Sequence, residues 1–389
     1  MIDSILIGMT GLASQSKGLN VISNNVANLN TVGFKGASLR FEDLYYQEDA
    51  RSEMHGNGVT TGESSLSMKQ GETRQTGNDL DLMIDGAGLF VVNANGSLHF
   101  TRNGQFSLSS DGSIEEKSSG AKLSYLSDAG NLGTFSVRGR RTSAPVQTSA
   151  ITFSGNLSLS GTQHTISNVT VYDGVGNAAQ FSLKFENNSA NAQGTWNVSV
   201  LNAAGTSVAT GQIAFSGGRP VLGSDKISFS LPSAGGASVP VTLDFSTDAT
   251  STAGSADSTL IVSGQNGRPA GSLTKVTFDS EGRLAVSYSN GSTEKFEKLA
   301  LAWFAGGESL KQEGGNLMAA RDGIAPIYGF VSQGVNGKLS VGALEMSNVD
   351  ISQQFSELII TQRAYQASSH IITTANEMLQ QLFDMKGRR

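Results

Sequence analysis

Residues whose side chains can bind a metal or transfer a proton are scattered along this sequence. The four histidines, His55, His99, His164 and His370, stand far apart, and none has the spacing of a metal-ligand pair. There is no cysteine, which excludes a thiol nucleophile, a thiolate-bound metal and a disulfide framework. Acidic residues are also dispersed, so no pair of catalytic carboxylates of the glycosidase type can be assigned. The sequence therefore predicts no catalytic residue, no metal and no cofactor, and hence a protein that is not an enzyme.

One acidic cluster, Asp79, Asp81 and Asp85, resembles the beginning of a calcium-binding loop. An EF-hand loop requires an acidic residue or Asn where Met83 stands and Gly where Ile84 stands, so the match fails. The same aspartates alternate with apolar residues, which is the period of a β-strand. We therefore predict that they lie on the solvent-exposed face of a strand.

Glycine-rich stretches do not predict a phosphate site either. Residues 334–338, Gly-Val-Asn-Gly-Lys, lack the loop spacing and the Ser or Thr after lysine that a P-loop requires. We predict a hairpin turn at this position. No Gly-x-Ser-x-Gly or His-Glu-x-x-His motif occurs, which leaves hydrolase chemistry without a recognisable nucleophile or zinc site.

Composition and charge favour a β-rich protein without a nucleic-acid partner. The net charge of −6 provides no basic surface for phosphate backbones. The 47 glycines and 6 prolines, with Ser, Thr and Asn filling the middle of the chain, suit many short strands joined by tight turns. The N-terminal stretch has no basic leader and contains Asp3, Gly8 and Gly11. It is neither a cleaved signal peptide nor a membrane span, so we expect no membrane insertion.

Both ends of the chain carry apolar residues at the alternating spacings of three and four that are typical of long amphipathic helices. We predict helices within 1–30 and 346–389 that pair as a coiled coil. The second helix has two apolar stripes, and because one partner covers only one stripe, helices of other subunits are expected to cover the second. The predicted interface residues are Ile5, Met9, Leu12, Leu19, Ile22 and Val26 in the first helix and Phe355, Leu358, Tyr365, Ile372, Leu379 and Phe383 in the second.

Between the helices the sequence predicts a β domain that is split into two halves. Residues 31–76 are polar and irregular in pattern, and they suggest a linker or an arm that becomes ordered against neighbouring subunits. Alternating apolar residues then predict strands in 77–146 and again in 267–345. The hairpin signals of the first half are Asn95-Gly96, Asn103-Gly104 and Asp111-Gly112.

A second β domain is predicted at 147–266, inserted into the first. Eight short alternating segments indicate an antiparallel sandwich or barrel. They are Ile151/Phe153, Val169/Val171, Phe181/Leu183/Phe185, Trp196/Val198/Val200, Ile213/Phe215, Ile227/Phe229, Val241/Leu243/Phe245 and Leu260/Val262. The predicted fold class is therefore multidomain α+β, with long terminal helices and two nested antiparallel β domains.

Several stretches resemble the bacterial flagellar rod and hook family. Residues 23–35, Ser-Asn-Asn-Val-Ala-Asn-Leu-Asn-Thr-Val-Gly-Phe-Lys, are similar to the N-terminal signature of that family, and 347–350 with 362–367 are similar to its C-terminal signature. Residues 77–81 and 103–106 match the split β domain, and 171–177 resemble the inserted domain of the family's hook members. The family-motif residues in the predicted linker are Asn24, Asn25, Asn28, Asn30, Gly33, Phe34 and Lys35.

The resemblance implies a structural subunit of the flagellar hook, a curved tubular polymer that acts as a universal joint between rod and filament and encloses an export channel. It implies an extracellular location, reached through the flagellar type III export apparatus without a cleaved signal peptide. The implied partners are other copies of the chain in a helical homopolymer, the distal rod protein, the hook cap protein and the hook–filament junction protein. A distal rod protein remains an alternative, and a secreted β-rich adhesin is the alternative from another class.

Overall fold

The structure is a computed structural model that describes residues 2–44, 46–48, 54–232, 238–254 and 257–386. The chain divides into two compact units, each assembled from segments that are distant in sequence. Unit 1 consists of Met1–Arg138, Val276–Val286 and Glu294–Arg389, and unit 2 consists of Gly139–Lys275 and Ser287–Thr293. The last three residues of the predicted C-terminal segment lie outside the described residues.

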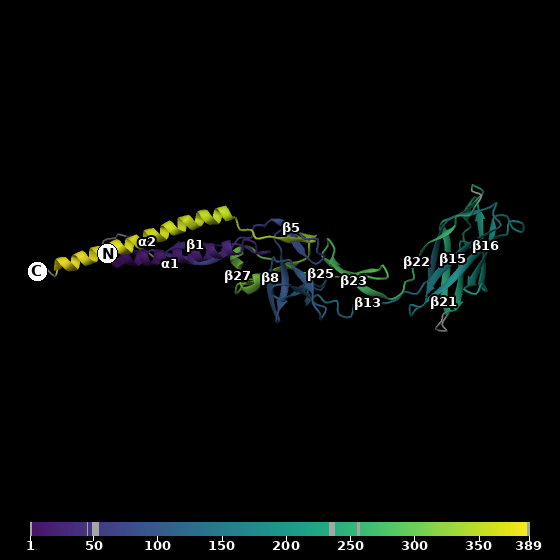
Figure 1. Ribbon diagram of the computed structural model, residues 1–389, viewed down its shortest axis with the longest axis horizontal. Coiled ribbons are helices and arrows are strands. Elements are labelled where there is room, and N and C mark those ends of the chain that lie inside the picture. The colour runs from purple at the N-terminus through teal and green to yellow at the C-terminus, as the bar shows by residue number, and fades with distance from the viewer. Residues whose placement is uncertain (1, 45, 49–53, 233–237, 255–256, 387–389) are drawn as a thin grey trace. The chain divides into compact units, whose positions relative to one another are not determined.

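Unit 1 contains two long helices, which lie side by side in Figure 1. They are antiparallel, because Gly8 of the first faces Ile372 of the second while Gly18 faces Thr361. The second helix begins after Asp350, whose Oδ1 accepts hydrogen bonds from two N–H groups of the next turn, at 2.8 and 3.1 Å. The prediction that the terminal helices contact each other is confirmed. The helices described are α1 (Ile2–Ala27), α2 (Ile351–Lys386) and the short 3₁₀ helices η1 (Gly307–Ser309) and η2 (Gly314–Asn316).

Residues that follow α1 form a β-hairpin that packs along the same helix. Strands β1 (Ala37–Asp43) and β4 (Val59–Leu66) pair antiparallel. Ser14 Oγ of α1 donates a hydrogen bond to the carbonyl oxygen of Val59 at 3.2 Å, which joins the hairpin to the helix. The prediction of an irregular segment is therefore wrong for these strands.

The β body of unit 1 is antiparallel and surrounds an apolar core. In its main sheet the strands follow the order β25-β11-β7-β8-β28-β27, and Leu89, Val91, Phe100 and Ala302 are among the core residues. Strands β23 (Gly271–Phe278) and β24 (Arg283–Tyr288) contain residues of both units. The other strands are β2 (Tyr46–Glu48), β3 (Met54–Gly56), β5 (Thr73–Gln75), β6 (Leu82–Asp85), β7 (Leu89–Ala94), β8 (Ser97–Thr101), β9 (Phe106–Leu108), β10 (Ile114–Glu116), β11 (Lys122–Leu126), β12 (Leu132–Thr134), β25 (Thr293–Leu299), β26 (Leu301–Trp303), β27 (Leu310–Gln312), β28 (Met318–Ala320), β29 (Ile327–Gly329), β30 (Lys338–Val341) and β31 (Ala343–Glu345).

Three local predictions in unit 1 are wrong. Asp81 is buried rather than solvent-exposed, because its carboxylate accepts hydrogen bonds from Thr76 Oγ1 at 2.7 Å and Asn78 Nδ2 at 3.0 Å. Asn103-Gly104 does not close a hairpin, since β8 pairs with β7 and β28, whereas β9 pairs with β10. Residues 334–338 likewise do not close a hairpin, because β29 pairs with β26 and β30 pairs with β6. Turn-forming residues predict a change of direction, but they do not determine which strands pair.

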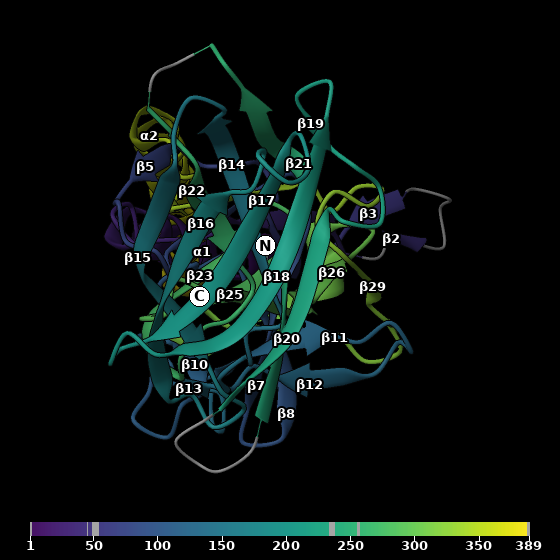
Figure 2. The same cartoon turned by 90° about the vertical axis from the view of Figure 1, so that its right-hand side faces the viewer.

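Unit 2 is built from two sheets that share one apolar core. One sheet has the order β15-β16-β17-β18-β19, of which β15 to β18 lie next to one another in Figure 2, and the other has the order β20-β21-β14-β22. All eight predicted segments fall in or beside these strands, and their apolar residues make up most of the core. The prediction that all strands pair antiparallel is wrong for β14 and β21, which pair in parallel. The strands are β13 (Thr142–Ser143), β14 (Ala150–Ser158), β15 (Gln163–Tyr172), β16 (Ala178–Asn187), β17 (Thr195–Asn202), β18 (Ser207–Ser216), β19 (Arg219–Pro220), β20 (Lys226–Pro232), β21 (Ser238–Thr252) and β22 (Ile261–Gln265).

Candidate functional site

The contact between α1 and α2 is made largely by small residues. A Cβ atom added to Gly8 would lie 2.7 Å from Ile372 Cγ1, and one added to Gly11 would lie 2.9 Å from Ser368 Oγ. Separations below 3.0 Å are too short for real Cβ contacts, so these glycines allow the two helices to approach closely.

The same arrangement leaves a large apolar surface of both helices exposed. On α1, Leu6 is 53% exposed and Met9 is 55% exposed. On α2 the exposed side chains continue to the end of the helix, where Phe383 is 72% exposed and Met385 is 73% exposed. Contiguous exposed apolar surface of this kind is uncommon on a soluble monomer and marks a site of association.

The structure separates the twelve predicted interface residues into three groups. Ile22 is buried within the chain. Met9, Phe355 and Phe383 are exposed. The remaining residues are half-buried: Ile5, Leu12, Leu19, Val26, Leu358, Tyr365, Ile372 and Leu379.

The motif between α1 and β1 is a rigid junction. Asn25 is buried, and its side chain makes two hydrogen bonds with the backbone of Ala37. Its Nδ2 donates to the carbonyl oxygen at 2.8 Å, and its Oδ1 accepts from the N–H at 3.0 Å. Its Nδ2 also donates to Gln354 Oε1 of α2 at 2.9 Å. Gly33 has φ of 67° and donates its N–H to the carbonyl oxygen of Glu345 at 2.7 Å. One segment of the motif thus holds α1, β1, β31 and α2 together.

The other motif residues support this junction or lie beside it. Asn28 Nδ2 donates to the carbonyl oxygen of Asn24 at 3.0 Å, which closes the last turn of α1. Phe34 and Lys35 are buried, whereas Asn30 is exposed. Together with Gln312, Glu313 and Asn316, five of the motif's residues line a cavity of about 420 Å³: Asn24, Asn28, Thr31, Val32 and Phe34.

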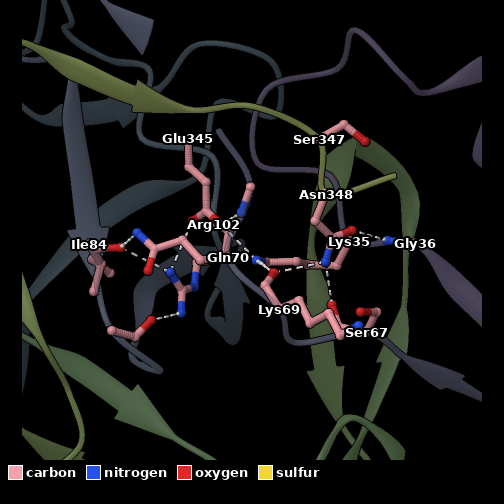
Figure 3. A network of polar contacts seen from close by, with 12 residues as sticks. Lys35, Gly36, Ser67, Lys69, Gln70, Ile84, Arg102, Glu345, Ser347 and Asn348 are labelled. Atoms are coloured by element: carbon pink, nitrogen blue, oxygen red, sulfur yellow. Dashed lines mark hydrogen bonds and ion pairs between the residues drawn. The ribbon is translucent and has the colours of Figure 1, made fainter. Parts of the chain in front are cut away.

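Beneath the motif lies a buried ion cluster formed by Lys35, Arg102 and Glu345 (Figure 3). Lys35 Nζ is 2.7 Å from Glu345 Oε1, and Arg102 Nη1 is 2.9 Å from Glu345 Oε2. All three side chains are at most 1% exposed. Backbone groups complete the cluster, since Lys35 donates to the carbonyl oxygen of Lys69 at 2.6 Å and Glu345 accepts from the N–H of Gly71 at 2.8 Å.

The electrostatics of the ion cluster are unbalanced, with two cations for one carboxylate. Burial lowers the pKa of Lys35, and the adjacent Glu345 carboxylate opposes this shift. Burial also lowers the pKa of Arg102, again against the attraction of Glu345. Among the described residues, the carboxylate of Glu345 is the anionic group that compensates these two desolvated charges.

Sequence reasoning assigned no role to Arg102 or Glu345. They are separated from their partners by 243 and 310 positions, so no local pattern indicates the contact. The available signal was Glu345 itself, the single charged residue of β31, which follows Ala343 and Leu344. Both of these neighbours are fully buried.

Two general searches of the described residues are negative. No helix among them is long and apolar enough to cross a membrane. No three His, Cys, Asp or Glu side chains in the described ranges lie close enough to share a metal ion.

Comparisons with known proteins identify the same segments. A family model described as "Flagella basal body rod protein" matches residues 5–35, and one described as "Flagellar basal body rod FlgEFG protein C-terminal" matches 340–385. A third, "Flagellar hook protein FlgE/F/G D1 domain", matches 83–167. The flagellar hook protein FlgE of Rhizobium meliloti is 30% identical over 406 residues, covering 97% of this chain and 98% of that protein. The chain belongs to the flagellar hook protein family.

Two further similarities agree with membership of the hook protein family. The flagellar hook protein FlgE of Salmonella typhimurium is 28% identical over 408 residues, covering 97% of this chain and 98% of that protein. The crystal structure of Helicobacter pylori flagellar hook protein FlgE2 superposes with a TM-score of 0.51 at 13% identity, covering 70% of this chain and 99% of that one. The junction described above lies within or next to the matched N-terminal and C-terminal segments.

Proposed function

We propose that the chain is the structural subunit of a flagellar hook and that it polymerises through its terminal helices. The observation that carries this proposal is the exposed apolar surface of α1 and α2 in a hook-family chain. Burial of apolar side chains is favourable, but Leu6, Met9 and Phe383 are exposed to solvent in the single chain. In a helical polymer the helices of neighbouring copies bury these side chains.

The proposed polymer is a curved tube with three layers. The terminal helices, 1–30 and 346–389, form the inner tube around an export channel and pack as a coiled coil with helices of other copies. The split β domain, 77–146 and 267–345, forms the middle layer, and the inserted domain, 147–266, lies outside. The proposed order of the layers is supported by the segments that make up unit 1, because this one unit contains both ends of the chain.

The remaining partners follow from this position in the flagellum. The tube connects the distal rod protein to the hook–filament junction protein and transmits torque as a universal joint. Its subunits leave the cell through the flagellar type III export apparatus and assemble under a hook cap protein. The role is mechanical, which agrees with the family's structural character and requires no catalytic residue.

Replacing Met9 tests whether the helices carry the assembly. Because Met9 is 55% exposed in the single chain, Met9→Asp should leave the fold intact, yet it places a charge in the proposed interface. We expect the unmodified chain to form curved tubes in sedimentation and negative-stain microscopy, and Met9→Asp to remain monomeric. Circular dichroism should give the same melting curve for both monomers.

Met9→Leu is the matched control, because it keeps an apolar side chain of similar size and should assemble normally. Normal tubes from Met9→Asp would contradict the proposed interface. Straight tubes from the unmodified chain would favour the distal rod protein, a possibility that the rod-protein descriptions of two matching family models keep open.

A further inference from the structure

Among the described residues, the last turns of α2 extend past the start of α1. The antiparallel pairing of Gly8 with Ile372 and of Gly18 with Thr361 places the start of α1 opposite the turn around Met378. The second helix continues to Lys386, and in Figure 1 the end of α2 lies beyond the start of α1 along the helix pair. Leu382 is 50% exposed, and beyond it Phe383 and Met385 are still more exposed. We call residues 379–386 the overhang.

An apolar groove of about 210 Å³ lies near the other end of the helix pair. It is formed where α1, α2 and β1 meet, and its walls include Ile22, Phe41 and Ile360. Ile22 is buried at its floor, whereas Phe41 is 47% exposed and Ile360 is 68% exposed at its rim. An apolar cavity of roughly 150 Å³ holds a benzene molecule, so this groove is large enough for one phenyl ring.

We infer that the overhang of one copy docks in this groove of a second copy, with Phe383 as the side chain that enters it. This inference rests on the proposed function and identifies one contact within the proposed polymer. Phe383 is the most exposed aromatic side chain of α2, and buried aromatic residues are the usual anchors of protein interfaces.

The occupant of the groove must belong to another chain. Within one chain, Phe383 lies 22 residues along α2 from Thr361 at the groove, which is roughly 33 Å of continuous helix. A helix cannot bend back over that distance, so the overhang cannot reach its own groove. The overhang and the groove are different surfaces of the chain. Identical chains that join through two different surfaces form an open helical filament, unless the rotation between successive copies closes them into a ring.

Charge supports the same pairing. Glu357 lines the groove, and the sequence from 384 to 389, Asp-Met-Lys-Gly-Arg-Arg, has one acidic and three basic residues. A segment of net positive charge that follows an apolar anchor is complementary to an apolar groove with a carboxylate at its edge.

Cysteine cross-linking tests the contact directly, because the chain has no cysteine of its own. Leu382→Cys places a thiol beside Phe383 and keeps that anchor, and Ser38→Cys places a thiol in the groove lining and keeps its apolar walls. The two single variants are mixed, assembled into tubes and oxidised. We expect a disulfide-linked dimer on a non-reducing gel from the mixture and none from either variant alone, because a disulfide requires Cα atoms within about 7 Å.

Ser4→Cys serves as the control for random collision, since Ser4 is also exposed but lies at the opposite end of α1. A mixture of Leu382→Cys with Ser4→Cys should remain monomeric on the gel. Tubes that form without the Leu382–Ser38 dimer, or with an equal yield from the control mixture, would overturn the docking inference and leave the hook assignment intact. If the unmodified chain forms no tubes, the proposed function fails and the inference fails with it.

The anchor role of Phe383 has an independent measurement. Phe383→Ala should raise the critical concentration for tube growth at least about tenfold, as loss of an interface anchor does. Phe383→Leu keeps most of the apolar contact and should raise it much less. Equal critical concentrations for Phe383→Ala and the unmodified chain would contradict the role of this side chain.

Discussion

Glu345→Gln should destabilise unit 1 by about 3–5 kcal/mol, the cost expected for breaking a buried ion pair. The substitution preserves the size of the side chain but removes the one carboxylate among the described residues that pairs with Lys35 and Arg102, whose side chains are 1% and 0% exposed. Two desolvated cations then repel each other without compensation. Hydrogen exchange measured by mass spectrometry should show lost protection in β5 and β31, which pair next to the cluster, while the strands of unit 2 keep theirs.

The imbalance of the ion cluster predicts an order among the variants. Lys35→Met removes the excess cation and leaves Arg102 paired with Glu345. It should therefore lower the free energy of unfolding by less than Glu345→Gln does. Glu308→Gln is the surface control, because Glu308 pairs with Arg40 at 3.0 Å while both side chains are more than 60% exposed. Its effect should stay within about 1 kcal/mol. If Glu345→Gln were as mild as Glu308→Gln, the cluster would not hold the junction.

The sequence predicted the helices and the strands of unit 2 because each has a simple period. Apolar residues at spacings of three and four identify α1 and α2, and alternating pairs such as Phe181 and Leu183 identify strands whose one face is buried. The predicted helical segments, 1–30 and 346–389, contain α1 and α2.

The junction was beyond sequence reasoning for a different physical reason. Its motif was found as a family resemblance, but the groups that complete it are the side chain of Glu345 in β31, the side chain of Arg102 after β8 and the backbone of Lys69 in the loop before β5. A buried charge is stable only with its partner, and neither Arg102 nor Glu345 has a local neighbour that reveals one. Gly8, Gly11 and Gly18 of α1 were not among the predicted interface residues, because glycine carries no apolar signal, although Gly8 and Gly11 allow α2 to approach closely.

The second large effect is expected at Gly33, where the motif meets the end of β8. Gly33 has φ of 67°, and a Cβ atom there would lie 2.3 Å from the backbone nitrogen of Asn103 and 2.4 Å from the carbonyl carbon of Arg102. Neither atom can move aside as a flexible side chain can, because both belong to the backbone. Gly33→Ala should therefore displace the motif, weaken the Gly33–Glu345 hydrogen bond and move Lys35 away from its carboxylate. We expect the free energy of unfolding to fall by about 3 kcal/mol or more, the range of severe backbone strain combined with loss of a buried ion pair.

Gly77 provides a control that separates steric clash from backbone strain. Its φ of 69° is nearly the same as that of Gly33, but a Cβ atom at Gly77 would meet nothing within 4 Å. Gly77→Ala should therefore cost only the conformational penalty of about 1–2 kcal/mol for a left-handed residue. The two variants are compared by urea denaturation of unit 1 and by tube formation. Because the motif links α1 and α2 to the β body, Gly33→Ala should also abolish assembly while Gly77→Ala preserves it, and equal losses at the two glycines would show that the close approach at Gly33 has no role.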